Sequence, residues 1–413
     1  MSPSILRPPQ LRTLETEAEH RAATWTELFY DLVFVVAVAQ LSHRLLHDVE
    51  VHHLSWQAFI EYAGMFTVLW WGWVSFTFFA DRYDTDDPIQ RLLAVSQMVA
   101  VAGMAAAFGF GDQALETISI PFAVAYIGVR LALLAMYSRV WWNVENSRTL
   151  VSGYLGGFSL DVLVWVLSLL VPPPWRYVLW AVGIVISFAT PWVMRREQAR
   201  TPLSVSHLPE RFGLFTILVL GETIAAVVAG LAQEKWQVGA TAGAVAGVMM
   251  ATSLWWVYFD NLEGSVVRRD PNRKHDWHPT AWIYSHLPLA IMLTMAGVGA
   301  EELVAAAAGH EFESSLRWLS VIGVSGAYLS MAMILTSSTS SDPKVQFSRK
   351  AQLRVGGAAA VVLLGLVGGQ LRPSVFVVIL AAIAVVQVLL DLLVDIMAQR
   401  GTIPAALSEA AEL

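Results

Sequence analysis

The chain has 413 residues, of which 56% are hydrophobic, only 14% are charged and 17 are tryptophan. A soluble globular domain carries about 25% charged residues, so this composition, with a mean hydropathy of +0.56, excludes a soluble protein. The chain contains no cysteine, which excludes disulfides, thiolate metal sites and cysteine nucleophiles. Its net charge of −7 is divided between the two aqueous sides of a membrane. We therefore expect an all-α integral membrane protein.

Residues 1–24 are polar and contain several prolines, without the apolar core of a cleavable signal peptide. We predict that they form a disordered cytoplasmic arm. A membrane span needs about 20 largely apolar residues, and twelve segments meet that requirement. The predicted spans are 28–46, 56–79, 91–111, 117–138, 150–171, 176–194, 211–232, 236–259, 279–300, 317–336, 352–371 and 373–396. Proline-containing turns at 172–174 and 372–373 separate spans that together are too long for one crossing.

The distribution of basic residues predicts the orientation. When the N-terminus is placed in the cytoplasm, most Lys and Arg residues fall on that side, as the positive-inside rule requires. An even number of spans returns the chain to the same side. We therefore predict that the arm and a tail over 398–413 are both cytoplasmic.

Two similar motifs indicate an internal repeat. "ELFYDLVFVVAVAQL" begins at Glu27 and "ERFGLFTILVLGETI" begins at Glu210, and each is followed by a span with paired tryptophans that ends in aspartate. We interpret the chain as two six-helix halves, 25–196 and 210–397, joined by a cytoplasmic linker over 197–209. Because each half holds an even number of spans, both are expected to have the same orientation.

The paired motifs resemble the bacterial low temperature requirement A (LtrA) family, and the resemblance extends over nearly the whole chain. It implies a multi-pass protein of the bacterial inner membrane that is associated with growth in the cold. It implies no activity and no functional residue. The second motif departs from the first at one position, because Leu214 stands where Asp31 stands in the first copy. The two halves cannot be equivalent at this point.

Polar side chains within spans cost on the order of 3 kcal/mol to insert when they are charged, so they are candidates for a polar pathway. The candidates are Asp31, Gln97, Arg130, Asp161, Glu222 and His286. Arg130 and Asp161 are expected to form an ion pair, either as a structural tie or as a substrate or ion site. Glu222 has Gln97 and His286 at similar depth as expected hydrogen-bond partners. It suits a proton-coupled carrier and equally a neutral structural acid, whereas His286 by itself is better explained as a packing histidine.

Acidic residues near the cytoplasmic helix ends form a second candidate group. Glu27 and Asp31 lie four residues apart and share a helix face. A cap from Thr24 or Thr26, together with the helix dipole, explains Glu27 but not Asp31, which is a turn deeper. The acids either surround a cytoplasmic vestibule or are scattered interfacial charges. The vestibule candidates are Glu27, Asp81, Asp84, Glu210 and Asp260.

The last span carries Gln387, Asp391 and Asp395 on one face near its cytoplasmic end, and we expect this face at the protein surface. The sequence shows no nucleophile with a base, no nucleotide-binding loop and no basic patch with aromatic residues. We therefore expect no enzyme, cofactor, resident metal or nucleic-acid partner, and no particular oligomeric state is indicated. The preferred function is a secondary transporter or carrier in the lipid bilayer, coupled to a small solute, proton or ion. The alternative is a non-transporting membrane sensor or scaffold.

Overall fold

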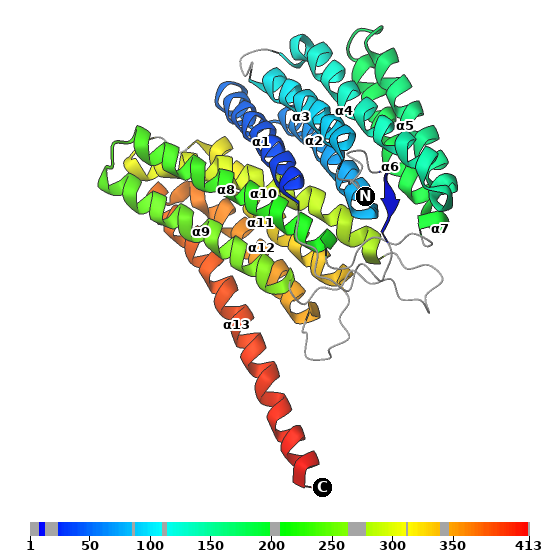
Figure 1. The fold of residues 1–413 in the computed structure, drawn as a ribbon. Helices are drawn as coiled ribbons and strands as arrows, with labels where there is room; N and C mark the ends of the chain where they lie inside the picture. Colours follow the sequence, from blue (N-terminus) through cyan, green and yellow to red (C-terminus); the bar gives the residue numbers. More distant parts are fainter. Residues whose placement is uncertain are drawn as a thin grey trace. The chain divides into compact units, whose positions relative to one another are not determined.

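The structure, a computed structural model, describes residues 8–12, 24–84, 87–109, 114–198, 207–262, 278–310, 313–338 and 347–411 (Figure 1). These residues are overwhelmingly helical, and 12 of the helical segments are long and apolar enough to cross a membrane. Each of the twelve overlaps one predicted span, which confirms the helical membrane class and the number of spans. The two proline-containing turns separate distinct helices, as predicted, because one helix ends at Ser168 before the next begins at Trp175, and another begins at Pro373.

The chain divides into two compact units. Unit 1 comprises Met1–Asp48 and Trp56–Arg211. Its elements are β1 (Gln10–Leu11), α1 (Trp25–His52), α2 (Trp56–Arg82), β2 (Tyr83–Asp84), α3 (Pro88–Phe108), α4 (Leu115–Asn143), η2 (Glu145–Ser147), α5 (Arg148–Ser168), α6 (Trp175–Val193) and α7 (Arg195–Gln198), followed by the start of α8 (His207–Gln233).

Unit 2 comprises Val49–Ser55 and Phe212–Leu413. It therefore takes the last residues of α1 and all of α8 from Phe212 onward. Its other elements are α9 (Val238–Leu262), α10 (His278–Ala308), α11 (Ser314–Ser337), α12 (Phe347–Val367), η3 (Gly368–Gln370) and α13 (Pro373–Ala411). The predicted repeat and its common orientation stay predictions.

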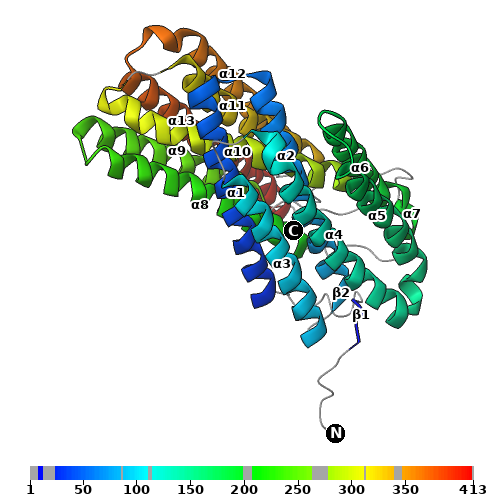
Figure 2. The same ribbon diagram turned by 90° about the horizontal axis from the view of Figure 1, so that it is seen from above.

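Helix hairpins build each unit. In unit 1, α3 packs against α4 and α5 packs against α6 (Figures 1 and 2). In unit 2, α10 packs closely against α11 because small residues face each other, and a Cβ added to Gly323 would lie 2.4 Å from the backbone nitrogen of Ala296. Small residues at such contacts let two helix backbones approach, which is the usual basis of helix association in membranes.

Local signals fix the start of α3. Asp87 is its N-cap, the Asp87 side chain accepts a hydrogen bond from the backbone N–H of Gln90 at 2.8 Å, and Pro88 occupies the first turn. Arg139 of α4 donates to the other carboxylate oxygen of Asp87 at 2.7 Å. The capping residue therefore also joins the two helices of the hairpin.

The predicted N-terminal arm requires a correction. The arm was expected to be disordered, but Gln10–Leu11 forms strand β1, which pairs antiparallel with β2. The backbone N–H of Arg12 also donates to the carbonyl of Arg82 at 3.1 Å. Pro8 and Pro9 precede the strand, and proline restricts the backbone to values compatible with an extended chain. Residues 1–7 and 13–23 of the arm lie outside the described residues.

The C-terminal helix α13 is longer than one membrane crossing needs. Its 39 residues extend about 58 Å at 1.5 Å per residue, whereas the hydrocarbon core of a bilayer is about 30 Å thick. The apolar part is Pro373–Ala398. Figure 1 shows the backbone of α13 continuing as a helix through the region that was predicted as a tail.

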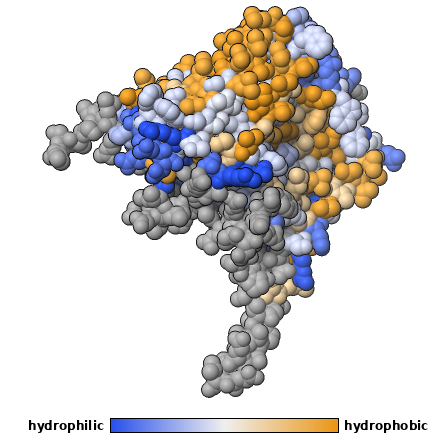
Figure 3. All heavy atoms as spheres, turned by 90° about the vertical axis from the view of Figure 1, so that its right-hand side faces the viewer, coloured by the Kyte–Doolittle hydropathy of each residue, from blue (hydrophilic) through white to orange (hydrophobic). Residues whose placement is uncertain are grey.

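Large apolar side chains cover outward faces of the spans. In unit 1 they include Leu92, Val99, Val124, Leu131, Leu163 and Val185, all of which are exposed. Figure 3 shows a broad hydrophobic area on the face that it presents, with hydrophilic residues gathered toward its margin. Exposed apolar surface of this extent is typical of contact with lipid.

Candidate functional site

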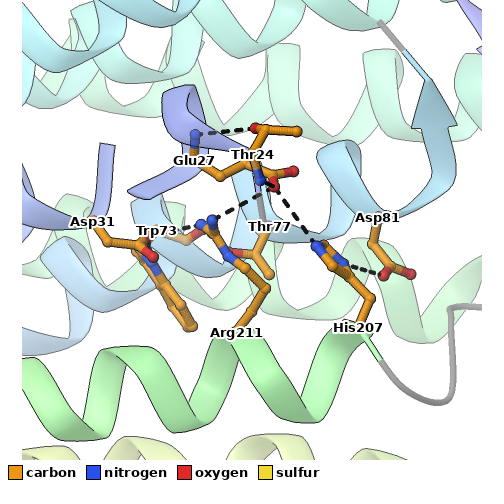
Figure 4. Close-up of polar contacts among 8 residues, drawn as sticks. All are labelled: Thr24, Glu27, Asp31, Trp73, Thr77, Asp81, His207 and Arg211. Atoms are coloured by element: carbon orange, nitrogen blue, oxygen red, sulfur yellow. Dashed lines mark hydrogen bonds and ion pairs between the residues drawn. The ribbon is translucent and has the colours of Figure 1, made fainter. Parts of the chain in front are cut away.

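Polar side chains from three helices meet in unit 1, where α1 and α8 begin and α2 ends. In each helix the contributing residues are spaced by four, so they lie on one face. We call this group the charge cluster (Figure 4). It consists of Glu27 and Asp31 from α1, Trp73, Thr77 and Asp81 from α2, and His207 and Arg211 from α8.

Glu27 has two roles at the start of α1. The backbone N–H of Thr24 donates to Oε2 of Glu27 at 2.8 Å, and the backbone N–H of Glu27 donates to Oγ1 of Thr24 at 3.3 Å. This reciprocal arrangement is a capping box, and it confirms the predicted cap by Thr24. The same Oε2 lies 4.0 Å from Nη1 of Arg211 and 3.6 Å from Nε2 of His207. The capping carboxylate is therefore also part of the charge cluster.

Asp31, one turn deeper, is held by two nitrogen donors. Its Oδ1 accepts hydrogen bonds from Nε1 of Trp73 and from Nη2 of Arg211, each at 2.7 Å. The side chain is fully buried, and its second oxygen, Oδ2, has no hydrogen-bond partner within the described part of the chain. The indole of Trp73 and the guanidinium of Arg211 therefore explain why a carboxylate stands at position 31, which helix capping does not explain.

His207 joins the two carboxylates nearest the helix ends. Its Nδ1 lies 2.9 Å from Oδ1 of Asp81, and its Nε2 lies 3.6 Å from Oε2 of Glu27. The ring is 1% exposed. His207 and Arg211 are four residues apart on α8, so the same helix face presents both basic groups to α1 and α2.

The charge cluster carries more acids than bases. Glu27, Asp31 and Asp81 face one guanidinium and one imidazole. Two unit charges 4 Å apart interact by about 4 kcal/mol at an effective dielectric constant of 20, so each contact is energetically substantial. A buried group that loses its only partner is strongly destabilised. Arg82, next to Asp81, adds a further buried guanidinium beside this acid. The charge cluster is thus a buried site in which several charged groups stabilise one another.

The residues that α2 contributes to the charge cluster extend over two turns of the helix. Trp73 and Asp81 are eight residues apart, which is about 12 Å along the helix. Thr77 lies between them, and its hydroxyl donates to the Trp73 carbonyl at 3.0 Å. The hydroxyl of Thr77 therefore has its hydrogen-bond acceptor within α2. The guanidinium of Arg211 lies 6.0 Å from the centre of the Trp73 ring. The polar contacts therefore run from the end of α2 toward the interior of unit 1.

A second buried pair confirms the ion pair predicted between α4 and α5. Nε of Arg130 lies 2.8 Å from Oδ2 of Asp161, and both side chains are fully buried. Arg130 also donates to Ser75 of α2 at 3.0 Å and to Ser187 of α6 at 2.5 Å, while Ser187 donates to Asp161 at 3.1 Å. The guanidinium lies 4.3 Å from the centre of the Phe158 ring. This pair has balanced charge and ties four helices together.

Unit 2 contains a third buried pair, and it corrects one sequence interpretation. Gln387 and Asp391 were expected at the surface, but they are 4% and 1% exposed. Arg354 of α12 donates to both side chains, and Asn261 of α9 donates to Asp391 at 3.3 Å. The prediction was wrong because α12 and α9 pack against this face of α13. A polar helix face near a helix end does not by itself distinguish solvent from a buried arginine.

Asp260, a predicted vestibule residue, belongs to unit 2. It lies 3.4 Å from Nζ of Lys350, which also contacts Asp395 at 3.0 Å. Both carboxylates are more than a third exposed, so solvent screens their excess negative charge. This group therefore differs from the charge cluster, where the acids are buried.

The remaining pathway candidates have separate surroundings. Gln97 in unit 1 is buried and donates to the backbone carbonyl of Val129 at 3.1 Å, which links α3 to α4. His286 in unit 2 places Nδ1 2.7 Å from the carbonyl of Trp282 and Nε2 3.0 Å from the hydroxyl of Tyr258. Both ring nitrogens of His286 therefore face groups other than Glu222, which is partly exposed in α8.

Two further vestibule candidates lie outside the contacts described above. Glu210 is exposed, next to Arg211 on α8. Asp84 belongs to β2, where its backbone is paired with Gln10. Of the predicted vestibule, the structure thus brings Glu27 and Asp81 together. Within the described ranges, no group of three or more His, Asp and Glu side chains is arranged to hold a metal ion.

Sequence reasoning missed His207 and Arg211, the two bases of the charge cluster. Arg211 stands at the first residue of the predicted span 211–232 and entered only the count of cytoplasmic basic residues, and His207 fell in the predicted linker. A signal was nevertheless present, because Arg211 directly follows Glu210 at the start of the second repeat motif. His207 and Arg211 are four residues apart at the start of an apolar helix, just as Glu27 and Asp31 are four residues apart at the start of α1. The spacing of the two bases is therefore the same as the spacing of the two acids.

Comparison with known proteins finds a relative and a family. The chain is 28% identical over 290 residues to an uncharacterised protein of Rhizobium meliloti (strain 1021), an alignment that covers 67% of this chain and 68% of that protein. Residues 22–396 match the family described as bacterial low temperature requirement A protein (LtrA). This match includes all twelve spans almost completely. The chain therefore belongs to the LtrA family.

Proposed function

We propose that the protein is a secondary transporter, coupled to protons or other ions, that uses the charge cluster to change its charge during the transport cycle. We place it in the bacterial inner membrane with both termini in the cytoplasm, where its transport would support growth at low temperature. The single observation that carries the proposal is the gathering of three buried acids around a buried histidine and arginine. Glu27 and Asp81 face His207, and Asp31 accepts from Arg211 one helical turn further along α8.

A buried group of ionisable side chains needs a reason. Ionisable residues within membrane segments are costly, and they are commonly associated with ion and proton pathways. The Arg130–Asp161 pair has equal numbers of charges, which suits a structural tie. The acids around Lys350 are partly exposed, which lowers their cost. The charge cluster combines buried acids with a histidine, whose ordinary pKa lies near neutral pH, and this supports assigning the coupling site to it.

A non-transporting sensor or scaffold is the second candidate. One observation favours it, namely that Oδ1 of Asp31 is held simultaneously by Trp73 and Arg211 at 2.7 Å. Such fixed contacts can hold three helices in place without any transport. A scaffold would lose stability when Asp31 is replaced, and the wild-type protein would move no solute.

Flux through reconstituted vesicles distinguishes the two candidates. The full-length protein is placed in lipid vesicles that contain a pH-sensitive dye, a membrane potential is imposed, and pools of amino acids, sugars, organic acids or alkali-metal salts are added. We expect at least one pool to produce a solute-dependent change in luminal pH or in charge movement. Asp31→Asn should lower that rate by about tenfold or more, equivalent to a barrier increase of about 1.4 kcal/mol.

The matched control is Glu145→Gln, which neutralises an exposed carboxylate whose side chain is 82% accessible. This variant should transport like the wild type. The proposal is wrong if no pool exceeds protein-free vesicles, or if folded Asp31→Asn protein transports at the wild-type rate.

A further inference from the structure

We infer that the coupling ion is a proton and that His207, which lies between Asp81 and Glu27, is the group that accepts it and passes it to Glu27. This inference rests on the proposed function, because it names the ion that would be coupled to transport at the same site. The evidence is the position of the imidazole, the charges that face it and the donors that surround the neighbouring acids.

The first step is the geometry of the ring. Nδ1 of His207 lies 2.9 Å from Oδ1 of Asp81, while Nε2 lies 3.6 Å from Oε2 of Glu27. A neutral imidazole carries one N–H, and a charged imidazolium carries two. In either neutral tautomer, one of the two carboxylates faces a nitrogen lone pair. Only the imidazolium offers an N–H to both, so the position of the ring suits a group that changes protonation.

The second step is the charge that faces the ring from each helix. Glu27 and Asp31 come from α1, Asp81 comes from α2, and Arg211 comes from α8 itself. Arg82, the residue after Asp81, is also buried; it interacts electrostatically with Asp81 and donates to Gln198 at 3.3 Å. An imidazolium at His207 would place a positive charge between the carboxylates of Asp81 and Glu27. Proton uptake at His207 is thus favoured by the two acids on either side of the ring.

The third step distinguishes a proton from a metal cation. Hard cations are bound by several oxygen ligands that converge at short distance. In the charge cluster the carboxylate oxygens instead face nitrogens, since Asp31 accepts from Trp73 and Arg211 and Asp81 faces His207. Nitrogen donors compete with a metal ion for the same lone pairs. A proton, by contrast, fits within this hydrogen-bonded arrangement.

The proposed transfer has a defined start and end. The Nε2–H bond of the imidazolium breaks and an O–H bond forms at Oε2 of Glu27, while the ring keeps the Nδ1 proton that faces Asp81. The present separation of 3.6 Å is longer than a hydrogen bond. The two atoms must therefore approach by roughly half an ångström or more before transfer. A change in helix position during transport would provide that approach, which couples proton movement to the conformational cycle.

The first test measures protonation directly. Full-length protein with ¹³C,¹⁵N-labelled histidine is studied by NMR in lipid bilayers, and the His207 signals are assigned by their loss in His207→Gln. We expect the ring nitrogens of His207 to change from the charged pattern at about pH 5 to the neutral pattern at about pH 8. Asp81→Asn should move the midpoint to lower pH by about 1–3 units, because it removes a carboxylate that stabilises the imidazolium. A single neutral tautomer throughout this range would refute the inference.

The second test measures coupling. In vesicles with a solute that the wild type moves, His207→Gln should abolish the pH change that accompanies each unit of solute moved, whatever the rate of solute movement that remains. His310→Gln is the matched control, because this histidine is 61% exposed and pairs with Glu234 in unit 2. An unchanged ratio of protons to solute in folded His207→Gln protein would overturn the inference.

The outcomes separate the inference from the proposed function. If solute movement follows a sodium gradient at clamped pH and does not depend on His207, the transporter stands and the proton assignment fails. If the wild type moves no solute in any pool, the proposed function fails and the inference fails with it. Variants that do not elute as a single monodisperse species are replaced by His207→Asn, which must give the same loss of coupling.

Discussion

Replacing Arg211 with methionine should destabilise unit 1 strongly, because it removes the one guanidinium of the charge cluster. Nη2 of Arg211 donates to Asp31 at 2.7 Å, and Nη1 lies 4.0 Å from Glu27. Methionine preserves much of the side-chain length and adds no charge. Asp31 is then left buried with only the indole of Trp73 as a donor. Breaking a buried pair by removing one partner costs roughly 3–5 kcal/mol.

A double-mutant cycle tests the origin of that loss. Asp31→Leu removes the other member of the pair, and Arg211→Met with Asp31→Leu replaces the pair by apolar groups. Such a replacement is often close to neutral, so the double variant should be more stable than Arg211→Met. The interaction free energy between Asp31 and Arg211 should be about 1–3 kcal/mol.

The assay is equilibrium unfolding in mixed micelles, followed by tryptophan fluorescence and repeated at several protein concentrations. Thermal melting gives a second measure, and for a unit of about 200 residues a loss of 3–5 kcal/mol corresponds to a decrease in Tm on the order of 10 °C. The matched control is Arg148→Met, which removes an arginine whose partner Glu145 is 82% exposed. The reasoning is refuted if Arg211→Met lies within about 0.5 kcal/mol of the wild type, or if the two single effects simply add.

Three further predictions concern single contacts. Trp73→Phe removes the indole donor to Asp31 at 2.7 Å and should cost about 1.5–3 kcal/mol in unfolding measurements, since the acceptor is charged; a loss below 0.5 kcal/mol would contradict this. Thr24→Ala removes half of a capping box and should cost about 0.5–2 kcal/mol, with hydrogen exchange faster only in the first turn of α1. Gly323→Ala places a methyl group 2.4 Å from the backbone of Ala296 and should cost about 1–3 kcal/mol; a stability equal to that of the wild type would show that α10 and α11 separate easily.

The spans were predictable because a lipid environment leaves few options. A backbone in hydrocarbon must satisfy its hydrogen bonds within the segment, so a long apolar run becomes a helix. The ends were less predictable. α1 extends to His52 and α13 to Ala411, well beyond their predicted apolar ranges, because adding residues to a helix that has begun is far less costly than nucleating one. The strand pair of Gln10–Leu11 with Tyr83–Asp84 has no hydropathy signal at all.

The acidic half of the charge cluster was visible in the sequence, but its basic half was not. Glu27, Asp31 and Asp81 were candidates because acids near or within spans are costly. His207 and Arg211 lie more than 170 residues after Asp31, and their contacts with α1 and α2 are set only when α8 begins beside those helices. The same reason explains the error at Asp391, where a face assigned to solvent is covered by Arg354.

The sequence by itself determined the environment, the number of spans and the helix faces that carry polar groups, since these depend on composition and on the period of the α-helix. Tertiary structure alone decided which polar groups far apart in the chain are partners, because helix packing brings them together. That difference separates Arg130–Asp161, which neighbouring antiparallel spans bring together and which was predicted, from Asp31–Arg211, which was not. The function proposed here depends on the second kind of contact.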